Sequence, residues 1–170
     1  MVAETESANE RRRLAALDGY DILDSPGEES FDRITRLAAA VFDVPIALIA
    51  LMERNSEWFK SCCGVEIREV ARDDSFCSHA IFERRPLVVA DATLDQRFAD
   101  NPYVTGPPGV RFYAGQPLIL RDGFCVGTLC ILDTKPRDLD EVGAALLRDL
   151  AHFAIQELDS LDAARRIAPI

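Results

Sequence analysis

The sequence lacks the features that mark several common classes of protein. It contains no apolar run of the roughly 18–20 residues that a membrane-spanning helix needs, and its longest apolar stretch, residues 45–52, has the length of a strand. Residues 1–13 carry acids before a basic cluster and include no apolar core of a signal peptide. From these absences we expect a cytoplasmic protein with no membrane partner.

The cysteines also lack a pattern. They are five in number and form no C-x-x-C pair, which disfavours both a disulfide framework and a zinc ribbon. We therefore expect reduced thiols. Cys125 and Cys130 lie on one expected strand, and their side chains should face opposite sides of a sheet unless Gly127 marks a bulge.

Several catalytic and binding motifs are missing as well. The sequence has no Walker loop, no dinucleotide-binding glycine pattern and no serine-hydrolase motif. Its 19 basic and 29 acidic residues give a net charge of −10, which works against affinity for nucleic acid because phosphate binding needs clustered Lys and Arg. The one basic cluster, Arg11–Arg13, is expected to lie on the solvent-facing side of a helix. We expect no nucleic-acid partner.

What is present is the composition of an ordinary globular protein. The chain has 170 residues, of which 48% are hydrophobic and 28% charged. A chain of this length can bury a core of its own but leaves no room for a second core. Residues 1–170 are therefore expected to form a single domain.

Hydrophobic periodicity predicts two amphipathic helices. Apolar residues recur at three- and four-residue spacing in residues 31–42 and 138–164. Asp138 followed by Glu141 resembles a capping box at the start of the second helix. This helix carries more apolar positions than one face of a sheet can use, so we expect it to mediate a homodimer.

The remaining pattern predicts an antiparallel sheet. Weaker helices are expected at 7–18 and 75–85, and residues 65–74 are interpreted as a loop. Five strands, most of them linked as hairpins, are expected at residues 45–52, 57–63, 86–91, 110–120 and 124–133. Helices flanking hairpin-linked strands are typical of an α+β domain.

A long connection separates the third and fourth expected strands. Connections of this length in compact domains are usually functional or disordered. Disorder is disfavoured because the segment contains Phe98 and Val104 and leads directly into Phe112 and Tyr113. Two interpretations stay open: an ordered loop that covers one face of the sheet, or a loop that also lines a ligand pocket.

Several strings of residues carry a resemblance to one family. They are RDDSFCSHAI at 72–81, DATLDQRFADNPYVTGPPGVRFYAGQPL at 91–118 and GTLCILDTKPR at 127–137, with further similarity in residues 31–51 and in WFKS at 58–61. Together they resemble the GAF domain of bacterial sensor kinases and cyclic-dinucleotide enzymes. The resemblance covers about residues 14–160, and its specificity lies in the joint occurrence of the strings.

The resemblance implies a GAF-like α+β fold. Its features are a central antiparallel sheet of five or six strands, helices on one side, and on the other side a cavity roofed by residues 65–109. It further implies a non-enzymatic sensory or regulatory domain in bacterial signal transduction, which dimerises through its terminal helices and acts on an effector domain or protein. The cofactor is left unknown, and no catalytic residue and no metal ligand are assigned. The candidate ligand-binding residues are Cys77, His79, Asp91, Arg97, Phe98, Asn101, Arg111, Phe112 and Tyr113.

Three alternatives stay open beside this hypothesis. Relatives with the same fold reduce free methionine-R-sulfoxide with a set of cysteines, but the cysteines here do not match that pattern. Cys77 with His79 resembles the attachment point of a bilin photosensor, although Ser78 intervenes. Zinc held by Cys77 and His79 would need further ligands, since two do not complete a site.

Overall fold

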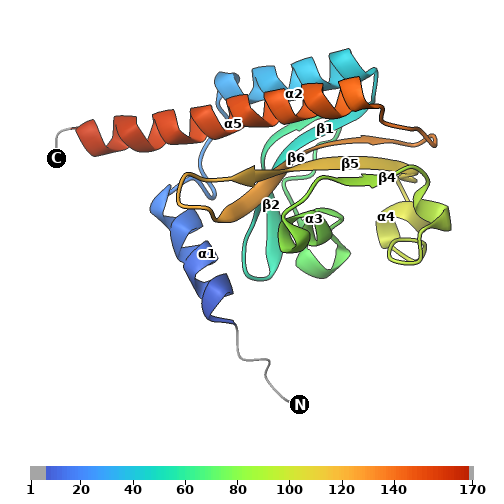
Figure 1. The fold of residues 1–170 in the computed structure, drawn as a ribbon, viewed down its shortest axis with the longest axis horizontal. Helices are drawn as coiled ribbons and strands as arrows, with labels where there is room; N and C mark the ends of the chain where they lie inside the picture. Colours follow the sequence, from blue (N-terminus) through green and yellow to red (C-terminus); the bar gives the residue numbers. More distant parts are fainter. Residues whose placement is uncertain (1–6, 169–170) are drawn as a thin grey trace.

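Six antiparallel strands form one sheet that separates two layers of helices and loops (Figure 1). The computed structural model describes residues 7–168. Its helices are α1 (Ala8–Gly19), α2 (Glu29–Phe42), α3 (Cys77–Glu83), α4 (Pro102–Thr105) and α5 (Glu141–Ile167). Its strands are β1 (Ile46–Met52), β2 (Ser56–Cys63), β3 (Glu69–Ala71), β4 (Leu87–Val89), β5 (Phe112–Ile119) and β6 (Cys125–Asp133). In this described range, no helix combines the length and apolar character needed to cross a membrane.

The strand order is β3-β2-β1-β6-β5-β4, which places the first and last long strands at the centre. β1 and β2 form one hairpin and β5 and β6 the other. The second hairpin turns at Gly123, whose φ of 87° lies in the left-handed region that the Asp-Gly turn requires. The expected antiparallel sheet and α+β class are confirmed.

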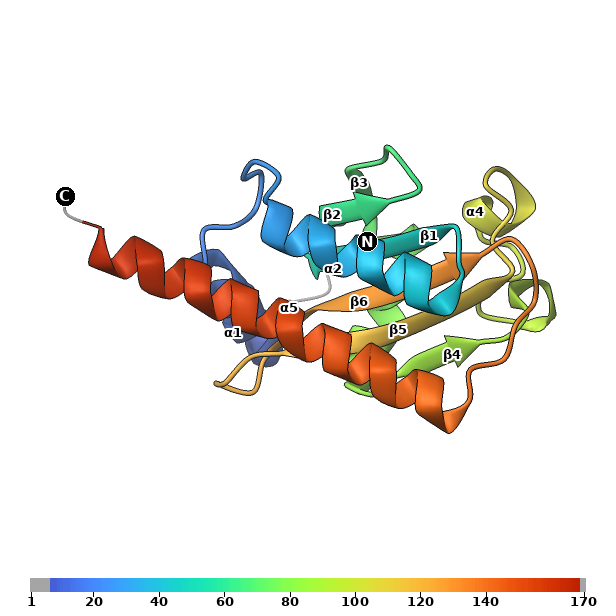
Figure 2. The same cartoon turned by 90° about the horizontal axis from the view of Figure 1, so that it is seen from above.

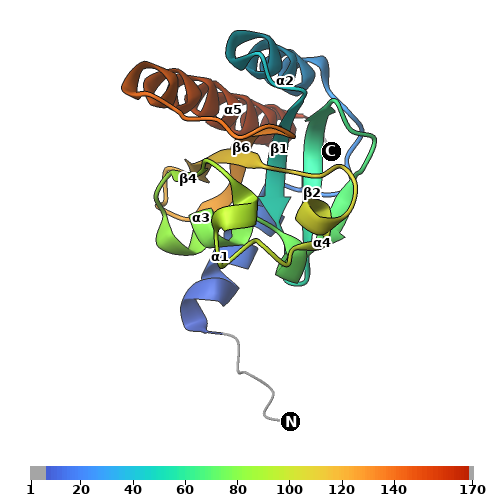
Figure 3. The same ribbon diagram turned by 90° about the vertical axis from the view of Figure 1, so that its right-hand side faces the viewer.

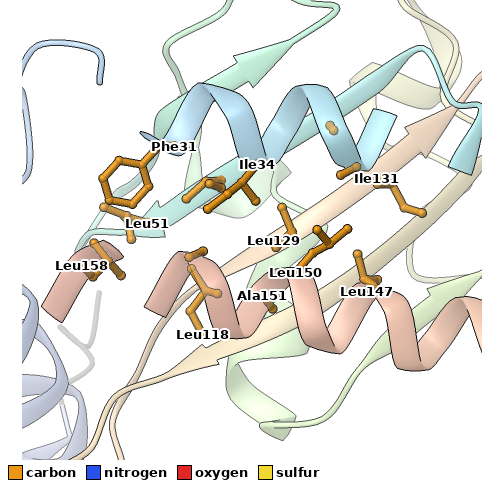
Figure 4. Close-up of a cluster of buried hydrophobic side chains, with 14 of the residues drawn as sticks. Phe31, Ile34, Leu51, Leu118, Leu129, Ile131, Leu147, Leu150, Ala151 and Leu158 are labelled. Atoms are coloured by element: carbon orange, nitrogen blue, oxygen red, sulfur yellow. The ribbon is translucent and has the colours of Figure 1, made fainter. Parts of the chain in front are cut away.

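The helices α2 and α5 lie side by side on one face of the sheet (Figure 2). Their apolar stripes close a core against alternate residues of β1, β5 and β6 (Figure 4). Residues of this core include Phe31, Ile34, Leu51, Leu118, Leu129, Ile131, Leu147, Leu150, Ala151 and Leu158. The two expected amphipathic helices thus form because each buries its stripe against the same sheet face.

The opposite face of the sheet carries α3, α4 and the connecting loops (Figure 3). The intervening residues of the same strands point to this side and form a second core. It includes Leu48, Phe59, Phe76, Phe98, Tyr113, Cys130 and Leu132. Both central strands therefore contact both cores.

Two strand bulges change which side chains face each core. The register of β5 and β6 shifts beside Leu118, and Cys125 and Cys130 then lie in the same core. This is the outcome expected if a bulge occurs near Gly127. In β2 a register shift leaves Lys60 between the residues that pair with β1, and Lys60 and Ser61 both bond to the helix side.

Three details of the sequence-based expectation are wrong. Residues 65–74 are not only loop, because they contain the short strand β3 paired with β2. The N-cap of α5 is Asp140 instead of Asp138, and its Oδ1 accepts from the Gly143 N–H at 2.7 Å. Arg13 is 5% exposed and donates to Glu10 and to the Met52 carbonyl, so it does not share a solvent-facing role with its neighbours.

Candidate functional site

A small cavity lies between the sheet and the loops on the side opposite α2 and α5. Its volume is about 70 Å³. The floor comes from the five strands β1, β2, β3, β5 and β6, and the roof from the loop after β2, the segment before α3 and the turns around α4. The lining residues are Ile46, Leu48, Glu57, Phe59, Val65, Ile67, Val70, Asp74, Ser75, Phe76, Cys77, Tyr103, Val110, Tyr113, Cys130 and Leu132. The expected cavity roofed by residues 65–109 is present.

The wall of this cavity contains a buried polar cluster around Cys77. The Cys77 Sγ accepts from the Tyr113 hydroxyl at 3.1 Å and from the Thr128 hydroxyl at 3.0 Å. It lies 3.9 Å from the Cys130 Sγ. Burial raises the pKa of the Cys77 thiol and of the Tyr113 hydroxyl, and it is the largest contribution for both groups. Both groups therefore stay protonated at neutral pH.

Glu57 brings a carboxyl group into the same cavity. It lies on β2 opposite Met52 of β1 and Val70 of β3, and only 3% of it is exposed. Burial raises the pKa of this carboxyl, against the lowering effect of hydrogen bonds with Cys77 and Ser75. Within residues 7–168, its Oε1 is the one buried side-chain oxygen or nitrogen that lacks a hydrogen-bond partner.

Aromatic stacking supports the cavity from behind. The Phe76 ring stacks on Phe98 at 4.5 Å between centroids and on Tyr113 at 5.2 Å. His79 meets the edge of Phe98 at 5.0 Å. Phe98 and His79 thus position Phe76, which lines the cavity, and do not line it themselves.

The polar residues of the long connection hold the roof in place. The Asn101 Nδ2 donates to the Asp74 carbonyl at 2.8 Å, and its Oδ1 accepts from the Tyr103 N–H at 2.9 Å. Arg111 donates to the Val104 and Val110 carbonyls. Asp91 accepts from Thr93. These bonds order a connection that has little regular structure of its own.

The structure brings two of the nine candidate ligand-binding residues, Cys77 and Tyr113, to the cavity wall. Arg97 pairs with Asp95 on the surface, and Phe112 points into the helix-side core. Of the other five candidates, His79, Phe98, Asn101 and Arg111 surround the cavity or hold its roof, whereas Asp91 bonds to Thr93 at the surface.

Sequence reasoning missed Glu57. The available signal was its position two residues before Phe59, since alternation in a strand puts both on one face. The adjacent apolar pair Trp58 and Phe59 hid this signal because it left the buried face of β2 ambiguous.

A larger hollow of about 590 Å³ lies on the surface between α1, α3 and the β5–β6 hairpin. Its central charges already pair with one another, because Glu10 accepts from Arg13 at 2.8 Å and from Arg72 at 2.6 Å. These two arginines hold the pKa of Glu10 at about 2. Across the described chain no group of three or more His, Cys, Asp or Glu is placed to hold a metal ion.

The fold and the cavity define a class of protein: an α+β domain with a loop-roofed cavity on one sheet face and helices on the other. The sequence profile of the GAF domain matches residues 26–158. The chain belongs to the GAF domain family.

One curated relative is a cyclic di-GMP phosphodiesterase of Pseudomonas aeruginosa. This chain is 41% identical to it over 154 residues, a match that covers 90% of this chain and 26% of that protein. The chain therefore spans about a quarter of the relative's length.

Solved structures show the same fold at low identity. The GAF domain of an Acinetobacter phosphoenolpyruvate-protein phosphotransferase has a TM-score of 0.65 and 14% identity, with 96% of this chain and all of that chain covered. The free methionine-R-sulfoxide reductase of Neisseria meningitidis has a TM-score of 0.66 and 16% identity, with 96% and 99% covered. The blue-light absorbing PixJ GAF domain of Thermosynechococcus elongatus has a TM-score of 0.65 and 16% identity, with 94% and 92% covered.

Proposed function

We propose that this chain is a non-enzymatic, cytoplasmic sensory domain that binds a small molecule in the cavity beside Glu57 and passes the signal to an effector domain or protein. The observation that carries the proposal is the cavity itself, which is lined by apolar side chains and contains a carboxyl oxygen without a protein donor. Small-molecule sites combine an apolar lining with a few placed polar groups in this way.

The central strands offer a route by which binding would be transmitted. On β6, Cys130 and Leu132 line the cavity while Leu129 and Ile131 pack against the helices. On β1, Leu48 lines the cavity while Ala47 and Ile49 face the helices. A ligand that shifts these strands therefore also changes the packing of α2 and α5.

The outward face of α2 and α5 supports a homodimer. Leu37 and Val41 on α2 are about half exposed, as are Leu146 and Phe153 on α5, and Val142 is 69% exposed. Val41, Val142 and Leu146 line one shallow surface hollow, which shows that the two helices share this apolar patch. A patch of this kind is typical of an interface, and a second copy presents the same self-complementary surface.

The geometry favours this proposal over the enzymatic and photosensory alternatives. A reductase needs a thiolate nucleophile, whereas burial raises the pKa of the Cys77 and Cys125 thiols. A bilin needs a pocket far larger than 70 Å³, and the Cys77 Sγ already accepts two hydrogen bonds.

A thermal-shift screen of cellular metabolites tests the proposed function. We expect at least one metabolite to raise the melting temperature through mass action. The variant Val70→Phe adds a ring to the cavity wall and should abolish this shift, whereas Val88→Phe makes the same change on the exposed side of β4 and should retain it. A stabilising metabolite whose effect survives Val70→Phe would contradict the cavity as the site.

A further inference from the structure

The charged groups that the sheet buries differ in how completely they are partnered. Lys60 Nζ is surrounded by the Ser25 hydroxyl, the Pro26 carbonyl and Glu28, all within 2.9 Å. Asp133 accepts from the backbone of Thr134 and from Arg137 at 2.6 Å each. Among the residues that the structure describes, Glu57 has no cationic partner, although it is equally buried. Its Oε1 therefore lacks both a hydrogen-bond donor and a compensating positive charge.

The lining of the cavity decides which charge a ligand can carry. Its acidic side chains are those of Glu57 and Asp74, and the lining contains no Lys, Arg or His. An anionic ligand would therefore enter a site without a counter-charge, which is strongly unfavourable at low dielectric. A cation would find the carboxyl of Glu57 together with the rings of Phe59, Phe76 and Tyr103, which attract positive charge through their faces.

The hydrogen-bonding capacity of the wall agrees with this preference. The Tyr113 and Thr128 hydroxyls already donate to the Cys77 Sγ. The group left to be satisfied is an acceptor, the Oε1 of Glu57, so the ligand must supply an N–H or O–H donor.

The volume sets the size of the ligand. An apolar protein cavity of about 150 Å³ holds benzene, whose ring has six non-hydrogen atoms. A cavity of about 70 Å³ is half as large and accommodates three or four such atoms.

We propose that the Glu57 cavity binds a small organic cation, an amidinium or short alkylammonium group. Its N–H donors engage the Glu57 carboxyl group, which releases its proton to solvent when the cation binds, while its hydrocarbon part contacts the aromatic lining. This inference rests on the proposed sensory function and names the chemical class of its ligand.

Three probes of matched shape test the charge preference. Acetamidinium, acetamide and acetate each have four non-hydrogen atoms in one plane and carry a positive, a zero and a negative charge. At neutral pH we expect acetamidinium to raise the melting temperature by about 4 °C at ten times its Kd. Acetamide should give a smaller shift and acetate none. Equal shifts from all three probes, or a preference for acetate, would overturn the proposal.

Two substitutions locate the effect. Glu57→Gln keeps the side-chain shape but cannot ionise to pair with a cation, so it should abolish the preference for acetamidinium over acetamide. Glu66→Gln makes the same change at an exposed position in the neighbouring loop and should leave the preference unchanged. If Glu57→Gln does not fold, amide NMR of the wild-type chain with acetamidinium gives the answer: shifts confined to residues 57, 70–77, 103 and 113 support the site, and shifts elsewhere contradict it.

The failure of this inference can be distinguished from failure of the proposed function. Suppose that a neutral or anionic metabolite stabilises the wild-type chain and loses this effect in Val70→Phe. This result would support the cavity as the ligand site and would contradict the proposal that its ligand is a cation. If neither the metabolites nor the three probes stabilise the wild-type chain, both proposals fail.

Discussion

Glu57 and Lys60 lie three residues apart on β2 and show two different outcomes for a buried charge. Lys60 is fixed by three oxygen acceptors from the segment that precedes α2, so its burial ties that segment to the sheet. Glu57 lacks such compensation at its Oε1. A buried polar group without a hydrogen-bond partner lowers the stability of the folded chain. Such a group is typical of a functional site, where proteins often give up stability for function.

The titration of Glu57 predicts how stability depends on pH. In the unfolded chain this carboxyl ionises near its ordinary pKa of 4.5, and in the folded chain burial raises the pKa. As the pH rises above about 4.5, the unfolded chain releases a proton that the folded chain keeps, so stability falls. Glu57→Gln removes this loss, and its melting temperature relative to wild type should increase between about pH 4 and about pH 8.

The exposed Glu66→Gln is the control for that comparison and should show no such increase. The groups that face Glu57 are Ser75, Cys77, Asp74, Tyr113 and Cys130. Burial raises the pKa of the Cys77 thiol and the Tyr113 hydroxyl, so both titrate above the range compared. A difference that stays constant with pH would show that Glu57 ionises in the folded chain as it does in the unfolded chain.

The cysteines should differ in reactivity according to burial. Cys77, Cys125 and Cys130 are at most 3% exposed, and we expect iodoacetamide to leave them unmodified in the folded protein. Cys62 is half-buried, and burial raises its pKa to about 11, so it should react slowly at neutral pH. Peptide mass spectrometry checks this order, with the denatured chain as the control in which all five cysteines react. Rapid labelling of Cys77 would favour the reductase alternative.

At this scale the sequence predicted the cavity better than its lining. The resemblance placed the roof correctly in residues 65–109, and it selected Cys77 and Tyr113. Phe112 and Tyr113 are adjacent in β5 and must face opposite sides, but apolar residues occupy both faces of this strand, so periodicity could not assign them. Asn101 and Arg111 bond to backbone carbonyls, and no local pattern reveals such long-range partners.

At the scale of elements, strong periodicity gave reliable predictions. The helices α2 and α5 and the four long strands lie where the sequence predicts them, because their apolar residues are buried against one another. The strand β3 has three residues and forms only because β2 offers it an edge, so tertiary pairing decides it. The bulge in β2 is likewise a property of the assembled sheet.

The strand β5 is shaped to hold Tyr113 over Gly115. A Cβ added at Gly115 would lie 2.1 Å from the Tyr113 Oη, so Gly115→Ala must displace the ring and break its hydrogen bond to Cys77. We expect a loss of about 1–3 kcal/mol in the free energy of unfolding, measured by urea denaturation. In a Tyr113→Ala background the same change should be nearly neutral. An equal loss in both backgrounds would mean that Gly115 is required for another reason.

At the scale of the whole molecule, the two faces of the sheet divide the proposed tasks. The helices α2 and α5 lie on one side of the sheet, and α3 and α4 lie on the other (Figure 3). The cavity is on the side of α3 and α4, and the apolar patch is on α2 and α5. The helix α5 has 27 residues and is about 40 Å long at 1.5 Å per residue, so it extends beyond the sheet (Figures 1 and 2). It is steadied near its end by the hydrogen bond from the Tyr20 hydroxyl to Asp159 at 2.8 Å.

The apolar patch predicts a dimer that a single charge disrupts. Phe153 is 53% exposed on α5, and Phe153→Glu should convert the dimer to a monomer in light scattering at about 50 µM, because each interface would bury two carboxylates. Phe82→Glu makes the same change at an 89% exposed position on the opposite side and should leave the dimer intact. A wild-type chain that is monomeric at this concentration would contradict the proposed interface.

We propose that the cavity beside Glu57, and not the larger surface hollow lined by Glu10, Arg13 and Arg72, is where this domain binds its ligand. Amide NMR during titration with the metabolite that most stabilises the chain tests this claim most directly. We expect the largest shifts in residues 57, 65–77 and 103–113, with smaller shifts continuing through β1 and β6 into α5. Shifts centred on Glu10, Arg13, Arg72 and Arg84 in the hollow, with those of Glu57 and Tyr113 unchanged, would contradict it.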